Sequence, residues 1–395
     1  MTSTSELASP TDTGERLRIA REAANVTQAD AAAAAGMART TLVAVEKGQR
    51  RVRIDELQLL AQCYGTSVNA LFRQGAVQID LLPKFRRLLE GTDTAIGRAA
   101  RRLTELAQAE IELENVLGIA HFRNDPPHWP ILAGDVRVQA EQDALELRHW
   151  LGLGLAPVTD IVALLELQLG VRVFVCDLSD NRISGMFAYD ETVGAVIMLN
   201  RKQRLERRTQ TAAHELGHFV STRGAPEVLL EGSSEQSRDE RYAASFARSF
   251  LTPRRAIAQK FREITAGSSR LTRRHVIVLA HFFCVSREAL VRRLEETGLV
   301  RTGTWDWFET HGGITDQQMR DVLGEAARIE WVMPAAERPA SMRLGLMAAE
   351  AWRKDLLSEG QLARLLKMDR PSLRAMIDEF NEEQADADGA LVLVN

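Results

Sequence analysis

The chain has 395 residues, of which 45% are hydrophobic and 26% are charged, and its formal net charge is −4. This composition is typical of a globular protein with two or three domains, and the charge shows no whole-chain preference for nucleic acid. Three widely spaced cysteines argue against a disulfide framework, a cysteine-rich zinc site and an iron–sulfur cluster. The N-terminus lacks the apolar core of a signal peptide, and no apolar run reaches transmembrane length. We therefore expect a cytoplasmic protein with no membrane partner.

The first 74 residues predict a small helical domain behind a disordered start. Residues 1–13 are rich in Ser, Thr and Pro, and we expect them to be disordered. Thr27 has the position of a helix N-cap, and Gly36 ends the short helix that follows it. The domain at residues 14–74 is expected to contain five short helices, at 14–26, 27–36, 38–48, 53–65 and 67–72.

Two of these helices have the layout of a helix-turn-helix. They meet in a tight turn at Gly36, and the second helix opens with small and basic residues. The stretch TQADAAAAAGMARTTLVAVEKGQR resembles the repressor-type helix-turn-helix family, the Cro/C1 or XRE class. The resemblance implies that the domain binds double-stranded DNA, with Leu42 and Val45 facing its core.

The same geometry predicts which side chains contact DNA. Arg39, Thr40 and Val43 would face the major groove, where Arg39 can donate a bidentate pair to guanine. Gln28 and four basic residues behind the recognition helix would bind phosphates. These basic residues are Lys47, Arg50, Arg51 and Arg53. Such modules usually bind as dimers, so we expect a homodimer. The alternative is a five-helix module that binds protein, with the basic run as a solvated face.

Residues 75–130 are expected to form a helical linker. The segment RLTELAQAEIELENVLGI favours a helix packed on its own chain over a dimerising coiled coil, because it holds too few heptads. A Pro-rich stretch at 121–130 marks the end of the linker. Four apolar residues lie roughly on one side of the predicted helix, namely Leu103, Leu106, Ile111 and Leu113.

Residues 131–300 predict a domain that contains both helices and strands. Two helices come first, in AEQDALELRHWLGLG and PVTDIVALLELQLG. The run VRVFVCDL predicts a strand, and ISGMFAYDETVGAVIMLN predicts two strands around a turn at Asp190 and Glu191. A helix with the motif HELGH comes next, and from there to about Leu299 we expect only helices.

His214, Glu215 and His218 in the motif HELGH have the spacing of a metal site. Positions four apart lie on one face of a helix, so both imidazoles can bind one ion. Glu215 lies beside them and can act as the base toward a water whose pKa the ion lowers. The flanking residues are apolar or small, and Gly217 leaves room for a close neighbour. The alternative is a pair of surface histidines on an ordinary helix, because so short a pattern also occurs by chance.

The next predicted helix, SRDERYAASFARSFLTP, is the expected source of a third ligand. Catalytic zinc takes three protein ligands, and this helix has acidic residues at its start. Asp239 and Glu240 are adjacent, and their spacing alone leaves both open. The helix also carries an apolar stripe, formed by Ala243, Phe246, Ala247 and Phe250.

The stretch from about Val158 to Leu299 resembles the ImmA/IrrE family of metallopeptidases. The segments that carry the resemblance are GVRVFV, ISGMFAYDETVGAVIMLN, AAHELGHF, DERYAASFARSFLTP and VLAHFFCVSREALVRRL. The resemblance implies a zincin-like α+β fold and an endopeptidase supported by zinc or manganese. It also implies a substrate, since such enzymes typically cut a repressor-type DNA-binding protein.

The family's helix ExxAN-xFA corresponds to ERYAASFA in this chain. The match implies that Glu240 is the third metal ligand, beside His214 and His218, and that Glu215 is the base. Ala244 stands where the family usually has Asn, and Gln210 stands where an aromatic residue often precedes the motif. Neither departure removes a ligand or the base, but both leave the choice of substrate open. We assign no oxyanion stabiliser, because a satisfied polar group is the simpler interpretation of each of the three donors considered, Tyr189, Tyr242 and His281.

Residues 301–395 predict a helical C-terminal domain with an acidic tail. Its segment LSEGQLARLLKMDRPSLRAMIDEF looks like the small helix-turn-helix of antitoxin-type proteins. A role in protein contact or sensing is at least as well supported as DNA binding, because neighbouring acids would repel phosphates. These acids are Asp369, Asp378, Glu379, Glu382 and Glu383. The earlier segment TRRHVIVLAHFFCVSREALVRRL also looks like a helix-turn-helix, but the family resemblance assigns it a structural role in the peptidase domain.

The sequence thus predicts a multidomain, mainly α protein. A five-helix helix-turn-helix domain is followed by an α+β zincin-like domain and a helical C-terminal region. The predicted function is a DNA-binding regulator fused to a zinc-dependent endopeptidase. We expect this enzyme to cleave a repressor-type transcription factor and so derepress stress, defence or mobile-element genes. The alternative is a non-enzymatic transcriptional regulator whose peptidase-like domain senses a ligand or a metal.

Overall fold

The computed structural model describes residues 10–24, 26–64, 94–224, 227–230, 237–324 and 340–382. The described part of the chain falls into two compact units. One unit contains the described N-terminal helices, residues 104–120, which include most of a long helix, and the described C-terminal residues from 346 to 382. The other contains a four-stranded sheet and the helices packed around it, and it carries the HELGH motif.

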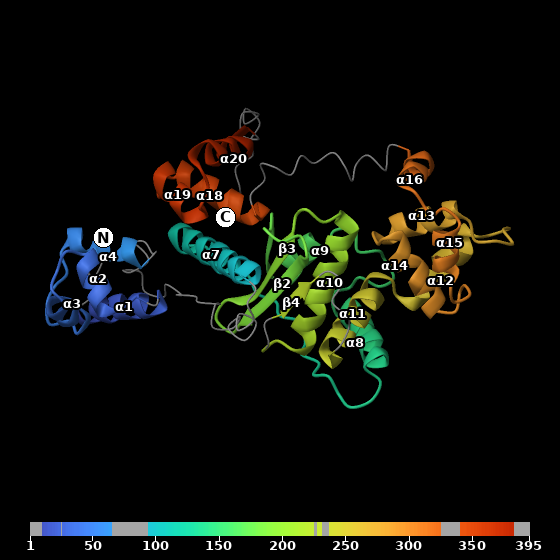
Figure 1. Ribbon diagram of the computed structural model, residues 1–395, viewed down its shortest axis with the longest axis horizontal. Coiled ribbons are helices and arrows are strands. Elements are labelled where there is room, and N and C mark those ends of the chain that lie inside the picture. The colour runs from blue at the N-terminus through green and yellow to red at the C-terminus, as the bar shows by residue number, and fades with distance from the viewer. Residues whose placement is uncertain are drawn as a thin grey trace, which may run out of the picture. The chain divides into compact units, whose positions relative to one another are not determined.

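The described part of the N-terminal domain consists of four short helices (Figure 1): α1 (Pro10–Ala23), α2 (Gln28–Ala34), α3 (Arg39–Glu46) and α4 (Ile54–Cys63). Each contributes apolar side chains to one small core, in which Leu42 and Val45 are buried as predicted. The Thr27 hydroxyl accepts a hydrogen bond from the Asp30 backbone N–H at 3.2 Å, which confirms the predicted N-cap. Gly36 has φ +64° in the turn, a conformation that glycine adopts without strain. The fifth predicted helix, at 67–72, lies outside the described residues.

Helix α1 begins at Pro10, so the predicted disorder is wrong for residues 10–13. Proline suits the first turn of a helix, because its φ is helical and its missing N–H has no partner there. The start of α1 is also packed, since Thr13 is buried. A Cβ built on Gly14 would lie 2.2 Å from the carbonyl oxygen of Val45. The close approach of α1 to the end of α3 therefore holds this turn in place.

The sheet has the strand order β1-β3-β2-β4. Its strands are β1 (Arg172–Cys176), β2 (Ile183–Asp190), β3 (Gly194–Asn200) and β4 (Glu227–Leu230). β1 is parallel to β3, whereas β2 pairs antiparallel with both β3 and β4. The turn predicted at Asp190 joins β2 to β3. The Asp190 carboxylate accepts a hydrogen bond from the Thr192 N–H at 2.9 Å. Strand β4 contradicts the prediction that only helices follow the motif. The segment EVLL is too short for a periodic pattern, and it becomes a strand by pairing with β2.

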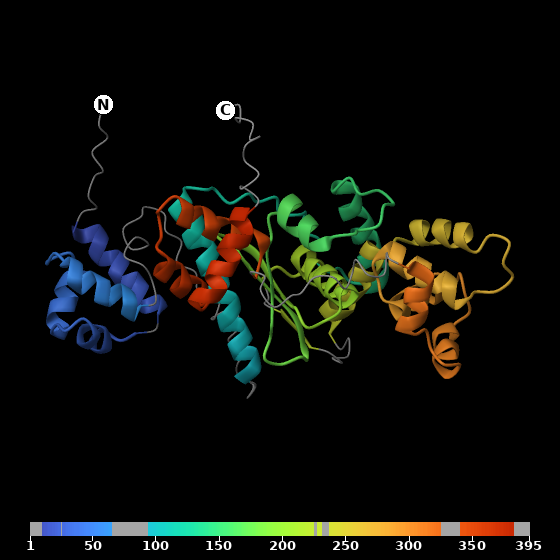
Figure 2. The ribbon, with the colours of Figure 1, turned by 90° about the horizontal axis from the view of Figure 1, so that it is seen from above.

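Helix α10 (Leu205–Ser221) carries the motif and packs on the sheet, where it contacts β2, β3 and β4. Helix α11 (Arg238–Leu251) packs on α10, and α8 (Val136–Trp150) packs on α11 (Figures 1 and 2). Because α10 lies between the sheet and α11, every residue from Thr211 to Ser221 is buried. The predicted apolar stripe of α11 is buried as well.

The second predicted helix of this domain is a short α9 (Ile161–Ala163) that continues as a π-helical turn, η1 (Leu164–Gln168). Between α11 and residue 324 the structure describes α12 (Arg254–Ile264), α13 (Arg273–Phe283), α14 (Arg287–Glu296), α15 (Thr304–Thr310) and α16 (Asp316–Leu323). Trp305, Phe308 and Met319 belong to the same apolar core as α13 and α14. The predicted domain boundary at residue 300 therefore does not match the packing, which continues to α16.

The remaining described helices are α7 (Thr94–Leu117), α18 (Met342–Arg353), α19 (Glu359–Leu366) and α20 (Arg370–Glu382). The four apolar residues predicted to share one side of α7 are all buried, and α19 and α20 confirm the last predicted pair. Residues 75–93 of the predicted linker and the acidic tail from residue 383 lie outside the described residues. Within the described ranges, no helix is both long enough and apolar enough to cross a membrane.

Candidate metal centre

The structure brings His214, His218 and Glu240 together between α10 and α11. The Nε2 atoms of the two histidines are 3.1 Å apart. The Glu240 carboxylate lies 3.3 Å from His214 Nε2 through one oxygen and 3.4 Å from His218 Nε2 through the other. Both histidines are buried, whereas 26% of the Glu240 side chain is exposed. Of the two adjacent acids that spacing alone left open, Glu240, the residue that the family resemblance implied, is the one that joins this cluster.

Local features of α11 place Glu240 against α10. Ser237 caps α11, because its hydroxyl accepts the Glu240 backbone N–H at 3.0 Å, so Glu240 lies in the first turn. Gly217 faces Ala243, and a Cβ added at Gly217 would lie only 3.0 Å from the Ala243 Cα. The two helices therefore approach as closely as the small Gly217 predicts. This spacing allows a first-turn carboxylate to reach both imidazoles.

Two further sets of contacts fix the His218 ring and the helix α11. His218 Nδ1 lies 3.1 Å from the Thr222 hydroxyl, which orients the imidazole so that Nε2 faces His214 and Glu240. Tyr242 on α11 donates a hydrogen bond to Asp143 on α8 at 2.7 Å, and Gln139 donates to the same carboxylate at 3.2 Å. Tyr242 is thus a buried anchor of α11.

Glu215 is fully buried and faces the sheet beside Gly185 of β2. A Cβ at Gly185 would lie 3.0 Å from Glu215 Oε1 and 2.5 Å from the methyl group of Thr211. Only glycine leaves this space open, so Gly185 is a supporting residue that the sequence analysis missed. A glycine inside a predicted strand was the available signal, because it often marks the close approach of another group.

Burial and hydrogen bonding favour the cation-binding forms of His218 and Glu240. Burial lowers the pKa of His218, because desolvation disfavours the imidazolium ion. Burial opposes the ionisation of Glu240, but hydrogen bonds with His214 and His218 outweigh it and hold the pKa of that carboxyl well below its usual range. Neutral imidazoles and an ionised carboxylate are the forms that bind a divalent cation.

Tyr189 and His281, the other two residues considered as oxyanion stabilisers, both lie outside the metal cluster. The Tyr189 hydroxyl donates to Asp125 at 3.0 Å and accepts from Arg123 at 3.2 Å. His281 lies on α13 and lines a different pocket. Neither belongs to the cluster of His214, His218 and Glu240.

The side chains predicted to contact bases lie in α3 of the N-terminal domain. Arg39 and Thr40 are exposed in its first turn, and Val43 is half-buried one turn later. Lys47 and Arg51 are also exposed. These positions are those of an accessible helix face, as a recognition helix requires.

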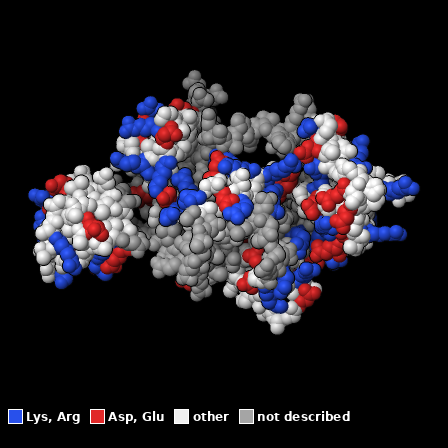
Figure 3. All heavy atoms as spheres, in the orientation of Figure 1, with Lys and Arg blue, Asp and Glu red and all other residues white. Residues whose placement is uncertain are grey.

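Three of the residues predicted to bind phosphate form hydrogen bonds or ion pairs with buried carboxylates of the same domain. Gln28 donates to the buried Glu46 at 2.9 Å. Arg50 forms an ion pair with the buried Glu56 at 2.8 Å, and Arg53 Nε lies 3.3 Å from the same carboxylate. Figure 3 shows basic and acidic side chains interspersed on the visible face of these helices. Only the contact between Gln28 and Glu46 joins two helices, α2 and α3, whereas Arg50 and Arg53 lie just before α4, the helix that carries Glu56.

The comparisons with known proteins identify two domains in the chain. A helix-turn-helix family model matches residues 17–71, and the model of the IrrE N-terminal-like domain matches residues 167–295. No curated protein matches the chain. Among solved structures, the apo form of the competence regulator ComR from Streptococcus vestibularis is 12% identical over 97% of this chain and 100% of that chain, with a TM-score of 0.16, which is too low to indicate a shared fold. The chain therefore joins an XRE-type helix-turn-helix domain to an IrrE-like, metallopeptidase-like domain, in that N-to-C order.

Proposed function

We propose that this DNA-binding regulator uses its protease-like domain as a metal-dependent endopeptidase. The observation that carries the proposal is the convergence of His214, His218 and Glu240. Ligands about 2.0 to 2.1 Å from a tetrahedral zinc ion lie about 3.3 Å from one another. The three edges of the cluster measure 3.1, 3.3 and 3.4 Å, so its spacing fits one such ion.

The chemistry of the donors fits as well. Two imidazole nitrogens and one glutamate oxygen form the ligand set of several catalytic zinc sites, in which the fourth position stays open. Manganese also accepts nitrogen and oxygen ligands, so the set suits either metal. A structural zinc site would close all four positions with protein ligands. This difference favours a catalytic or sensing site.

The residues of the chain have distinct roles in the proposed hydrolysis. A bound ion would act as a Lewis acid that polarises a peptide carbonyl and activates a water molecule. Glu215 would take the proton of the attacking water on its carboxylate and pass it to the leaving amide nitrogen. Gly185 leaves the space in which this carboxylate lies, and Thr222 holds the ring of His218.

We further propose that the substrate is a repressor-type transcription factor. The presence of both domains in one chain supports this, because the helix-turn-helix domain could bind the operator of a repressor or pair with a related repressor. Cleavage would then derepress stress, defence or mobile-element genes. The protein would act in the cytoplasm as a homodimer, in keeping with the dimeric habit of such DNA-binding modules.

Metal content tests the site directly. We expect the purified full chain to hold about one zinc or manganese ion per chain, measured by elemental mass spectrometry after equilibration with either metal. His214→Ala and Glu240→Ala should lose this ion, because each removes one of three ligands. Asp239→Ala is the matched control, since it removes the neighbouring acid and should keep the ion. A wild-type protein that binds neither metal would refute the proposal.

Glu215→Gln separates the enzyme from a metal sensor. This variant should keep the metal, because Glu215 is not a ligand, but it should lose cleavage. We would compare the new protein N-termini in cells that express wild type or Glu215→Gln. New N-termini within repressor-type proteins that depend on Glu215 would support the proposal. If the variant binds metal and both cultures show the same N-termini, the domain is a sensor and the proposed reaction is wrong.

A further inference from the structure

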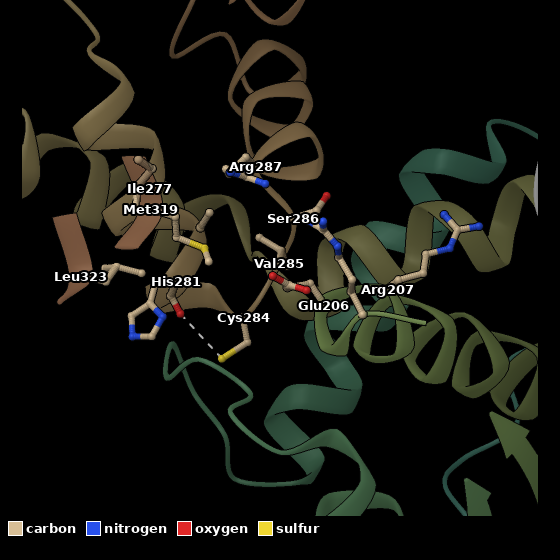
Figure 4. A pocket seen from close by; sticks show the side chains of 12 residues that line it. Glu206, Arg207, Ile277, His281, Cys284, Val285, Ser286, Arg287, Met319 and Leu323 are labelled. Atoms are coloured by element: carbon tan, nitrogen blue, oxygen red, sulfur yellow. Dashed lines mark hydrogen bonds between the residues drawn. The ribbon is translucent and has the colours of Figure 1, made fainter. Parts of the chain in front are cut away.

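A second pocket lies where α10 begins, and it shares no residue with the metal centre. It holds about 100 Å³ between the start of α10, the turn from α13 to α14, and α16. Figure 4 shows the Arg287, Val285, Met319 and Leu323 side chains around this space. The motif HELGH does not extend to this end of α10, so the proposed peptidase reaction leaves the pocket unused.

Two arginines of the pocket converge on a single carboxylate. Arg287 Nη2 lies 2.6 Å from one oxygen of Asp316, and Arg204 Nη2 lies 3.0 Å from the other. One carboxylate neutralises only one of these two guanidinium groups. The Nη1 atom of Arg287 is buried and has no hydrogen-bond partner within the described part of the chain. Buried donors are nearly always hydrogen-bonded, so this atom calls for an acceptor in the pocket.

The remaining charge in the pocket comes from its ionised side chains and from two helix ends. Arg207 lines it with its stem, and Figure 4 shows this side chain extending away from the space. Glu206 adds one carboxylate to the lining. Without the Arg207 guanidinium, the two arginines Arg204 and Arg287 against the two acids Glu206 and Asp316 give a formal charge of 2 − 2 = 0. Helices α10 and α14 both start here, and their N-terminal ends add positive partial charge.

Much of the rest of the wall is apolar, and His281, Cys284 and Ser286 add polar atoms to it. Ile277, Val285 and Met319 are buried, and Leu323 is half-buried beside them. An anion with no apolar part would leave this surface without a partner. An engineered apolar cavity of about 150 Å³ accepts benzene, so a pocket of 100 Å³ with an open mouth suits a chain of a few carbons.

We propose that this pocket binds a small carboxylate that carries a short aliphatic chain. The carboxylate accepts hydrogen bonds from Arg287 Nη1 and from the guanidinium of Arg204, beside Asp316. The aliphatic chain lies against Val285, Met319 and Leu323. Charge-assisted pairs with arginine give such a site its affinity, and the apolar wall selects for the chain.

The test measures binding of butanoate to the full chain by saturation-transfer NMR titration. Butanoate should bind roughly tenfold more tightly than acetate, because it buries two more methylene groups. It should also bind at least tenfold more tightly than butan-1-ol, which has the chain without the charge. Inorganic phosphate should bind more weakly than butanoate, since it has no apolar part. Equal affinity for butanoate and either acetate, phosphate or butan-1-ol would overturn the proposal, as would the absence of butanoate binding.

Variants locate the binding in this pocket. Arg287→Gln should weaken butanoate binding at least about tenfold, because it removes the charged donor. Arg204→Gln is the second variant in case the first unfolds, since the Arg204 side chain is 60% exposed and tolerates change. Arg255→Gln, an exposed arginine on α12, is the matched control and should bind as wild type does. A folded Arg287→Gln or Arg204→Gln protein with wild-type affinity would place binding elsewhere. Because the readout needs neither metal nor proteolysis, its outcome is independent of the proposed peptidase activity.

Discussion

The close packing of α10 on α11 predicts an unusual response to a glycine substitution. Gly217→Ala places a methyl group inside a helix, which by helix propensity alone stabilises the folded state by about 1 kcal/mol. At this position the new Cβ lies 3.0 Å from the Cα and 3.3 Å from the carbonyl oxygen of Ala243. These atoms belong to the backbone of a buried helix, so the strain cannot be relieved by rotating a side chain.

The size of the effect follows from this contact. Carbon atoms reach their optimal separation at about 3.5 to 4.0 Å, so α11 must move away by about 0.5 Å. Overpacking of this kind costs about 1 to 3 kcal/mol, which offsets or exceeds the gain in propensity. We expect a net loss of about 0 to 2 kcal/mol. The same displacement carries Glu240 away from His214 and His218, so metal affinity should fall by about tenfold or more, as it does for other supporting residues of metal sites.

Calorimetric unfolding and competitive zinc titration of the full chain measure both effects. Gly360→Ala in α19 is the matched control, because its Cβ would meet only the end of the Arg370 side chain at 3.4 Å. That variant should be stabilised by about 0.5 to 1 kcal/mol and should bind zinc as wild type does. If Gly217→Ala is equally stabilised and keeps its zinc affinity, the close contact of α10 with α11 does not set the geometry of the metal centre.

Other predictions concern the two domains separately. Tyr242→Phe should destabilise the protein by about 1 to 3 kcal/mol, because the buried Asp143 loses its hydrogen bond at 2.7 Å, and chemical denaturation measures this loss. Leu42→Ala should cost about 2 to 5 kcal/mol in the N-terminal domain and abolish DNA binding while metal content stays at the wild-type level; loss of the metal too would contradict the separation of the two cores. Arg51→Ala should weaken binding to all DNA sequences alike and lower the salt dependence of log K by about one unit, whereas Arg39→Ala should also relax the sequence preference; equal behaviour of the two variants in filter binding would contradict these roles.

Features that depend on neighbouring residues in the chain were predictable. Thr27 caps α2 and Gly36 forms its turn because both act on backbone within a few residues, and both lie where the pattern placed them. The hairpin of β2 and β3 followed from two apolar runs around Asp190. The motif HELGH required His214 and His218 on one helix face, and that spacing is a property of the helix itself.

The sequence pattern did not predict the features that depend on contacts between distant residues. Strand β4 has four residues, and its conformation depends on pairing with β2 about 45 positions earlier. The start of α1 at Pro10 depends on contact with the end of α3. The peptidase-like domain extends past residue 300 because Trp305 and Phe308 belong to the same apolar core as α13 and α14. In each case the structure depends on contact between segments that lie far apart in the sequence, and the local sequence pattern does not indicate such a contact.

The sequence by itself determined the two domain types and the helix that bears both histidines, and it indicated imidazole and carboxylate groups as the proposed donors. The family resemblance pointed to Glu240, and the small side chain of Gly217 pointed to a close neighbour. Only the tertiary structure decided how closely Glu240 approaches both histidines and that Gly185 makes the space for Glu215. The reason is physical: the spacing of residues along one helix follows from its backbone geometry, whereas the approach of α11 to α10 depends on the packing of side chains from every layer of the domain.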